Sequence, residues 1–242
     1  MAERQQQGNR TLSRFWSFFA PAYDFRYLQR WIYLPAQDEM IALLNTMESP
    51  TVVADIGCGT GILADRIEHE TQATEVYGVD LSTGMLTQAR ARSAQVNWLT
   101  GSAERLPFDD GALDAVVTTT AFQFFDQPAA LGEFHRVLAP RGLAAVAALS
   151  PPQRLPLRGL VASRVNIGPH HPRPTAMQTL FEDAGFTIRE QHRVHRPTWT
   201  RFFTDVITVG SKPGTPHDDN APPESCRAAV PRPAFNPGCR PD

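Results

Sequence analysis

The chain has 242 residues, of which 42% are hydrophobic and 20% are charged, and its formal net charge is -2 at pH 7. This composition suits a globular protein with one main core, and it excludes broad attraction to nucleic acid, which requires a concentrated basic surface. No apolar run approaches the roughly 20 residues that span a bilayer, so a cytoplasmic protein is expected. The three cysteines, Cys58, Cys226 and Cys239, lack the spacing of a disulfide framework or a metal centre, and no metal site is predicted.

Residues 1–50 are predicted to form a helical N-terminal cap. Aromatic residues are clustered in its first half, and the stretch with Met40, Ile41 and Leu44 has helical spacing. A lid of aromatic rings can cover a hydrophobic acceptor, and the alternative is that these rings only pack the cap onto the sheet. Arginines at positions 10, 14, 26 and 30 leave open a peripheral contact between this segment and a membrane surface.

The next predicted element is a short apolar strand, 51–56, that runs into glycines at alternate positions, Gly57, Gly59 and Gly61. Glycine is required where a tight turn visits conformations that a Cβ atom blocks and where the backbone approaches a ligand closely. A dinucleotide fingerprint would need a third glycine where Ile62 stands. The loop therefore predicts a nucleoside cofactor other than NAD, with an ordinary strand-to-helix turn as the alternative.

Strands and helices then alternate. Strands are predicted at 75–80, 97–100, 113–119 and 142–149, and helices at 61–70, 83–93 and 128–138. Unbroken apolar runs are typical of strands that are covered on both faces, and parallel strands joined by right-handed crossovers give an open, doubly wound sheet.

The pattern changes after residue 150. Residues 151–173, rich in proline and arginine, are predicted to form a lid loop. A helix from Pro174 to Gly185 precedes two strands, 186–195 and 199–210, whose short connection makes them antiparallel. The predicted fold is a Rossmann-like α/β, doubly wound, mostly parallel seven-stranded sheet with an antiparallel last strand and helices on both faces. Residues 51–212 form this domain, and 213–242 are predicted to be a disordered proline-rich tail.

Polar residues follow the predicted strands at their carboxyl ends, where open α/β sheets bind ligands. Asp80 ends the second strand, and its carboxylate can accept hydrogen bonds from both ribose hydroxyls. The alternative role is that of N-cap for the next helix, which Ser82 could fill as well. Asp55, below the glycine loop, is expected either to brace the loop amides or to approach a positive group of the cofactor.

Four segments together carry a resemblance. They are Val-Ala-Asp-Ile-Gly-Cys-Gly-Thr-Gly, Tyr-Gly-Val-Asp-Leu-Ser, Ala-Glu-Arg-Leu-Pro-Phe-Asp-Asp-Gly-Ala-Leu-Asp and Glu-Phe-His-Arg-Val-Leu-Ala-Pro-Arg-Gly. With them the chain resembles the class I S-adenosylmethionine-dependent methyltransferases, and within that class it is most similar to the ubiquinone/menaquinone C-methyltransferase type. The family's usual Pro-Gly-Gly is Pro140-Arg141-Gly142 here, which puts the local turn in doubt.

The resemblance implies an enzyme that binds S-adenosylmethionine and methylates a small hydrophobic or aromatic acceptor. It also implies a set of cofactor-binding residues. Asp55, Gly57, Gly59 and Gly61 would face the methionine part, Asp80 would bind the ribose, Leu81, Ser102, Ala103 and Glu104 would surround the adenine, and Thr119 with Thr120 would border the methionine and the substrate.

Methyl transfer by in-line displacement needs alignment and a dry site more than it needs catalytic side chains. The sequence contains no unique general base; Tyr23, His170 and His171 are the candidates, and His135 is expected to be a helix residue. Two alternatives stay open at this point. One is an NAD-dependent oxidoreductase on a related sheet, which Ile62 disfavours, and the other is a non-catalytic regulatory protein with a cofactor fold.

Overall fold

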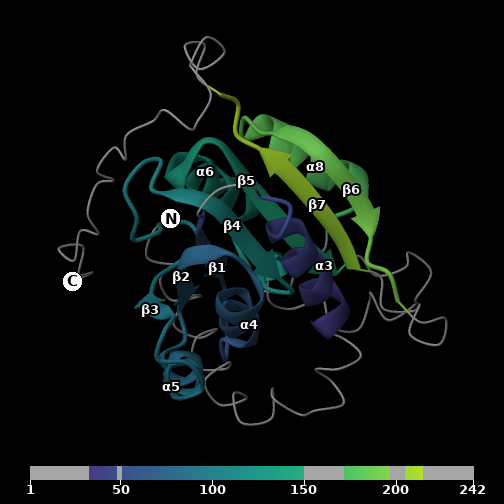
Figure 1. The fold of residues 1–242 in the computed structure, drawn as a ribbon. Coiled ribbons are helices and arrows are strands. Elements are labelled where there is room, and N and C mark those ends of the chain that lie inside the picture. The colour runs from purple at the N-terminus through teal and green to yellow at the C-terminus, as the bar shows by residue number, and fades with distance from the viewer. Residues whose placement is uncertain (1–32, 48–50, 150–171, 197–204, 215–242) are drawn as a thin grey trace, which may run out of the picture.

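The structure, a computed structural model, describes residues 33–47, 51–149, 172–196 and 205–214 (Figure 1). The described residues form a seven-stranded sheet in the order β3-β2-β1-β4-β5-β7-β6. Its strands are β1 (Thr51–Ile56), β2 (Ala73–Asp80), β3 (Asn97–Thr100), β4 (Leu113–Thr119), β5 (Leu138–Leu149), β6 (Thr187–Arg193) and β7 (Asp205–Ser211). The helices in these ranges are α3 (Leu34–Leu44), α4 (Ile62–Glu70), α5 (Thr83–Arg92), α6 (Gln127–Val137) and α8 (Pro174–Asp183), with the 3₁₀ helix η2 (Phe122–Phe124).

The strand order confirms the predicted doubly wound fold. The chain runs outward from β1 to β3 and then returns to the other side of β1 with β4, so the order reverses between β1 and β4. In open α/β sheets the crevice at such a switch point is where ligands bind. Strand β7 pairs antiparallel with both β5 and β6, as predicted. As a consequence β6 runs parallel to β5, and its carboxyl end lies at the same edge of the sheet as the carboxyl ends of β1 and β4.

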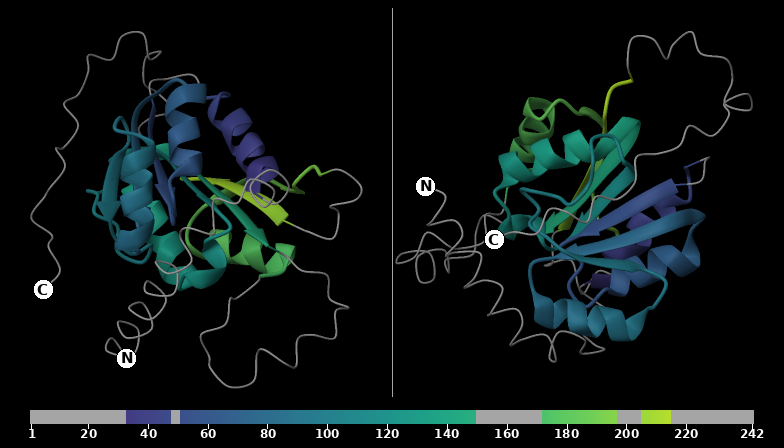
Figure 2. Two further views of the ribbon diagram at one scale, coloured as in Figure 1. Left: turned by 90° about the horizontal axis from the view of Figure 1, so that it is seen from below. Right: turned by 90° about the vertical axis from the view of Figure 1, so that its left-hand side faces the viewer.

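Helices cover both faces of the sheet, and Figure 2 shows α3 and α4 on one side and α6 and α8 on the other. Alternate residues of β1 explain this arrangement. Ile56 belongs to the hydrophobic cluster that includes Phe134 of α6 and Phe181 of α8, whereas Val53 belongs to the cluster that includes Met40 of α3 on the opposite face. Each such buried side chain contributes about 1.5–3 kcal/mol to stability. Every residue of β1 is thus buried, from both faces of the sheet.

Within the predicted cap 1–50, the structure describes the helix Leu34–Leu44, which begins with a proline in its first turn and packs against α4 and β4. The aromatic first half of the cap, the predicted lid 151–173 with its two histidines, and the tail after residue 214 lie outside the described residues. Within the part of the chain that the structure describes, no helix has the length and apolar character needed to cross a membrane.

The predicted start of β5 was wrong by four residues, and β2, α8 and β6 differ from their predicted bounds by one or two residues at an end. The strand predicted to begin at 142 is β5, which begins at Leu138 and continues through Arg141. Arg141 has a φ of 67°, a left-handed conformation that normally favours glycine, and its N–H donates to the carbonyl of Lys212 at 3.0 Å. A Cβ at the next residue, Gly142, would lie 2.9 Å from the Ala139 carbonyl oxygen. The unusual tripeptide therefore forms a bend inside a strand instead of a flexible turn before it.

Candidate functional site

The glycine loop connects β1 to α4 at the switch point. Its three glycines all have left-handed backbones, with φ values of 72° at Gly57, 56° at Gly59 and 80° at Gly61. The amides of Gly57 and Cys58 donate to the carbonyl of Val79 at 2.7 and 3.1 Å. Because Val79 is in β2, these bonds fix the loop against the carboxyl end of the neighbouring strand.

Two of the glycines are also required by their neighbours. A Cβ at Gly57 would lie 2.5 Å from the Cβ of Ala121, and a Cβ at Gly61 would lie 2.4 Å from the ring of Trp98. The same indole also covers Gly78 of β2, where a Cβ would approach it to 2.3 Å. The sequence analysis did not identify this packing role for Trp98, since nothing in the spacing of the glycines points to a residue of β3.

Asp80, at the end of β2, holds the glycine loop through its carboxylate. One oxygen accepts a hydrogen bond from the Gly59 amide at 2.9 Å and the other from the Ser82 amide at 2.7 Å. Ser82 is the N-cap of α5, with its hydroxyl accepting from the Met85 amide at 3.2 Å, so the capping role goes to Ser82 and not to Asp80. A carboxylate has about four acceptor positions, and the Asp80 carboxylate therefore retains the capacity to accept further hydrogen bonds.

Asp55 lies in β1 with only 2% of its surface exposed. Burial and the neighbouring Asp80 carboxylate raise its pKa to about 8, while a hydrogen bond with the backbone of Ala64 in α4 opposes the rise. The side chain thus braces the first turn of α4, whereas the sequence analysis expected it to brace the amides of the glycine loop or to approach a positive group. The Asp55 carboxyl group lies directly below the glycine loop, where burial makes its ionised form unfavourable. A nearby cation would stabilise the ionised carboxylate.

The segment after β3 lies beside Asp80, because the Gly101 amide donates to the Asp80 carbonyl at 3.2 Å. Ser102 donates to the Glu104 carboxylate, whose other oxygen accepts from the Asp126 amide at 2.9 Å. The Ala103 side chain is buried, whereas Ser102 and Glu104 are partly exposed. The predicted adenine-binding residues are therefore adjacent to the predicted ribose ligand, and Ala103 is the buried member of this group.

At the end of β4 the backbone is strained. Thr120 has a φ of 55°, and three hydrogen bonds among the described residues hold it there. Its backbone amide donates to the Ala147 carbonyl at 2.9 Å, its hydroxyl donates to the Thr119 carbonyl at 2.7 Å, and its carbonyl accepts from Nε2 of the Gln123 side chain at 2.5 Å. Strain of this kind, about 1–3 kcal/mol, is concentrated at functional sites.

Comparison with known proteins identifies the family. The family described as Methyltransferase domain matches residues 53–142. The demethylmenaquinone methyltransferase of Thermus thermophilus is 33% identical over 195 residues, which cover 69% of this chain and 84% of that protein. The chain belongs to the class I S-adenosylmethionine-dependent methyltransferases.

Two further matches support this assignment. The 2-phytyl-1,4-naphtoquinone methyltransferase of Nostoc punctiforme is 34% identical over 150 residues, covering 57% of this chain and 64% of that protein. A chain in the complex between the Haloferax volcanii Trm112 methyltransferase activator and a methyltransferase has the same fold, with a TM-score of 0.69, 22% identity, and coverage of 82% of this chain and 97% of that one. The protein is thus a methyltransferase enzyme that acts on a small molecule, and the oxidoreductase and non-catalytic alternatives are not supported.

In the structure of this methyltransferase, two of the four segments that carry the family resemblance contact each other. Arg136 of α6 donates to the carbonyls of Phe108 and Leu106 at 2.9 and 3.3 Å, and it forms an ion pair with Asp110 at 2.8 Å. Glu133, which also pairs with Arg136, accepts from the Leu106 amide at 2.9 Å. One charged pair on α6 therefore fixes the whole loop after β3, and with it the predicted adenine site.

The remaining candidates divide into two groups. Tyr23, His170 and His171, the proposed bases of the methyltransferase, lie outside the described residues and stay predictions. Cys58 is buried, and both burial and the carboxylates of Asp55 and Asp80 raise its pKa, which favours the unreactive thiol. His135 packs edge-on against the Phe186 ring at a centroid distance of 5.2 Å, in keeping with the structural role expected for it.

Sequence reasoning missed Gln123, which is 3% exposed. Its amide nitrogen holds Thr120, and its side-chain oxygen has no hydrogen-bond partner among the described residues. A buried acceptor without a partner costs about 1–3 kcal/mol, so the side-chain oxygen of Gln123 has a reason to accept a hydrogen bond from a water molecule or a ligand. Its position after β4 is visible in the sequence, but neither its burial nor its contact with Thr120 is.

Proposed function

We propose that this enzyme binds S-adenosylmethionine across the carboxyl ends of β1, β2 and β4 and methylates a small quinol-like ring. The observation that carries the proposal is the direct contact between the glycine loop and the Asp80 carboxylate, at 2.9 Å, at the point where the strand order reverses. This contact joins the two parts of the site that the family resemblance assigns to the methionine and to the ribose.

The residues present fit the cofactor. Gly57, Gly59 and Gly61 leave a backbone surface for the methionine part, and the remaining acceptor positions of Asp80 suit two ribose hydroxyls. Partly exposed side chains stand where the resemblance places the adenine and the methionine. They are Leu81, Ser102 and Glu104 on the adenine side and Thr119 on the methionine side, with the backbone of Ala103 between them.

Asp55 would supply the electrostatic counterpart of a cationic cofactor. Its raised pKa shows that ionisation is costly when no cation is present. A sulfonium or ammonium group above the loop would lower that cost and would itself be stabilised by the carboxylate. A buried acid with this property is more useful as a binding group than as a structural one, since an asparagine could brace Ala64 without the cost.

When bound, the cofactor supplies a methyl group on a positively charged sulfur for in-line displacement. The task of the protein is then to hold the acceptor atom behind that methyl group and to exclude water. The strained Thr120 and its partner Gln123 stand at the end of β4, on the predicted acceptor side of the methionine. We infer that they position the acceptor, while Tyr23, His170 or His171 would accept the proton that the acceptor loses.

The acceptor class comes from the relatives. The proteins named demethylmenaquinone and 2-phytyl-1,4-naphtoquinone methyltransferase are both at least 33% identical to this chain. A reduced naphthoquinone ring is electron-rich and apolar, which agrees with the hydrophobic or aromatic acceptor expected from the sequence. The peripheral membrane contact and the cytoplasmic location expected from the sequence stay predictions.

The decisive experiment measures cofactor binding and methyl transfer together. Isothermal titration of the full chain with S-adenosylmethionine should give one site, and Asp80→Ala should weaken it at least tenfold because hydrogen bonds to a carboxylate are lost. Asp38→Ala, which removes an exposed carboxylate on α3, is the matched control and should bind normally. The unmodified chain and Asp38→Ala should both transfer labelled methyl to a reduced naphthoquinone that lacks the ring methyl, and Asp80→Ala should transfer less.

Two results would contradict the proposal in different ways. Unchanged affinity in Asp80→Ala would remove the assigned cofactor site. Normal binding without methyl transfer to any reduced naphthoquinone or benzoquinone would leave the cofactor site in place and reject the acceptor class.

A further inference from the structure

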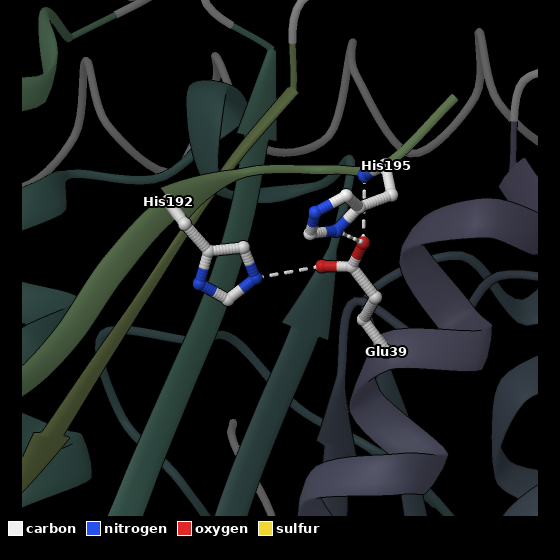
Figure 3. A group of neighbouring side chains, drawn as sticks. All are labelled: Glu39, His192 and His195. Atoms are coloured by element: carbon white, nitrogen blue, oxygen red, sulfur yellow. Dashed lines mark hydrogen bonds and ion pairs between the residues drawn. The ribbon is translucent and has the colours of Figure 1, made fainter. Parts of the chain in front are cut away.

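Three potential metal-ligating side chains converge at the junction between the N-terminal cap and the C-terminal strands (Figure 3). Glu39 comes from α3, whereas His192 lies in β6 and His195 follows its end. His192 Nε2 is 2.8 Å from one oxygen of Glu39, and His195 Nδ1 is 3.0 Å from the other. One atom from each residue falls within 4.8 Å of the other two. The two imidazole rings thus face one carboxylate from opposite sides.

The packing beneath these residues fixes their positions. Met40, next to Glu39, is fully buried, and Val194, between the two histidines, is 7% exposed. Both belong to the same hydrophobic cluster, which includes Ala36 of α3 and Ile207 of β7. Because each ligand residue adjoins a core residue, the helix and the strand end are held in a fixed relation, and the three side chains do not depend on a flexible loop for their approach.

The donor set suits a transition metal better than magnesium or calcium. Two imidazole nitrogens and one carboxylate oxygen are typical ligands of zinc, whereas the hard cations prefer oxygen alone. In a tetrahedral zinc site, bond lengths of about 2.1 Å put neighbouring ligand atoms about 3.4 Å apart. The present separations need to open by roughly half an ångström to reach that value, and the His195 side chain, 89% exposed, is free of packing that would prevent it.

The carboxylate is prepared for this role. The backbone amide of His195 donates to Glu39 Oε1 at 2.7 Å, the kind of outer hydrogen bond that orients a ligating carboxylate. The same oxygen lies 3.0 Å from His195 Nδ1, and the other oxygen lies 2.8 Å from His192 Nε2, so each oxygen of Glu39 already faces an imidazole nitrogen.

We propose that Glu39, His192 and His195 bind one divalent transition-metal ion, of which zinc fits the donor set best, and that the ion clamps α3 to the end of β6. With three protein ligands the fourth position is open to water. The sequence analysis predicted no metal site because it considered only the spacing of the cysteines. Glu39 and His192 are 153 residues apart, so they form no local sequence motif. The site is distinct from the cofactor loop, since β5 and β7 separate β6 from β4.

The test is zinc binding by the full chain, stripped with a chelator and freed of any histidine tag, in the absence of cofactor. Isothermal titration with zinc chloride should give one site with a dissociation constant of 10 µM or lower. His195→Ala and His192→Ala should each weaken binding at least tenfold. His69→Ala is the matched control, since His69 is exposed on α4 and contacts the carboxylates of Asp65 and Glu68 but does not belong to the cluster. This variant should bind zinc normally.

Cobalt gives a second, spectroscopic measurement. The cobalt-loaded chain should show the visible absorption of a four-coordinate ion, and Glu39→Gln should lose it. Because the His195 side chain is exposed, His195→Ala is expected to fold normally, which circular dichroism checks. Zinc affinity in His192→Ala and His195→Ala equal to that of the unmodified chain, or no zinc binding by the unmodified chain at 100 µM, would overturn the proposal. Neither result depends on the cofactor or the acceptor.

Discussion

The most informative substitution in this methyltransferase is Asp55→Asn. Asparagine has the same shape and retains an oxygen that can accept from Ala64, but it cannot ionise. In the folded protein the pKa of Asp55 is raised from 3.8 to about 8, first by burial and then by the Asp80 carboxylate. Between about pH 4 and pH 8 the folded state therefore holds a proton that the unfolded state has already released.

The sign of the effect follows from this difference. Where the folded state binds the extra proton, the free energy of unfolding falls as the pH rises, by up to about 1.4 kcal/mol per pH unit for one group. Asp55→Asn removes this loss. The variant should gain stability relative to the unmodified protein by about 3 kcal/mol between pH 5 and pH 7.5, and the gain should level off above the folded pKa of about 8.

Urea unfolding of both proteins at pH 5, 6.5 and 7.5 measures this difference. Groups with lowered pKa values, such as Glu39 and Glu133, titrate in both proteins and cancel in the comparison. Asp38→Asn, at an exposed position of α3, controls for the change in net charge. Parallel pH profiles for Asp55→Asn and the unmodified protein would refute the assignment of a buried, uncharged Asp55.

The same variant tests the proposed electrostatic role. If a cofactor cation stabilises the Asp55 carboxylate, binding of S-adenosylmethionine releases a proton, and its affinity should rise with pH up to about pH 8. Asp55→Asn should bind at least tenfold more weakly, without this pH dependence. The demethylated thioether product, which lacks the sulfonium charge, separates the contribution of the sulfur from that of the ammonium group.

Three further substitutions test individual contacts. Gly61→Ala, at a φ of 80° and with a Cβ 2.4 Å from Trp98, should lose about 3 kcal/mol of stability in urea unfolding. Gln123→Leu should lower kcat/KM about tenfold while costing only about 1 kcal/mol of stability, because it frees the strained Thr120. Arg136→Met should destabilise the protein by about 2 kcal/mol and weaken cofactor binding, because the loop after β3 loses its hydrogen bonds to α6.

Much of the fold was predictable because it depends on signals that are local in the sequence. The apolar run of β1 and the glycines that follow it indicate a strand and its turn, and the absence of room for a crossover helix between β6 and β7 indicates their antiparallel pairing. The start of β5 was not predictable for the opposite reason. Arg141 adopts a left-handed backbone because the distant Lys212 accepts its amide hydrogen, and no property of arginine indicates that conformation.

The residues of the candidate site also divide into those that local sequence signals could place and those that they could not. Asp80 and the glycine loop could be placed at one sheet edge from strand order alone, since both directly follow strands. Gln123 and Trp98 could not, because their roles arise from burial against Thr120 and Gly61. The cluster of Glu39, His192 and His195 could be predicted only from the complete strand order. Because β7 is antiparallel to both β5 and β6, the end of β6 lies at the same sheet edge as the end of β5.

That topology links the two sites of the molecule. Since β6 ends at the same sheet edge as β1 and β4, a helix that is clamped to the end of β6 is held relative to the edge where the acceptor is expected to bind. Helix α3 also packs on α4, whose first turn Asp55 braces. The helix that leads from the N-terminal segment into the sheet is thus held near its middle by the contacts of Glu39 with His192 and His195, and along its side by α4. Loosening the cluster should therefore affect acceptor binding before it affects cofactor binding, since the glycine loop keeps its own hydrogen bonds to Val79 and Asp80.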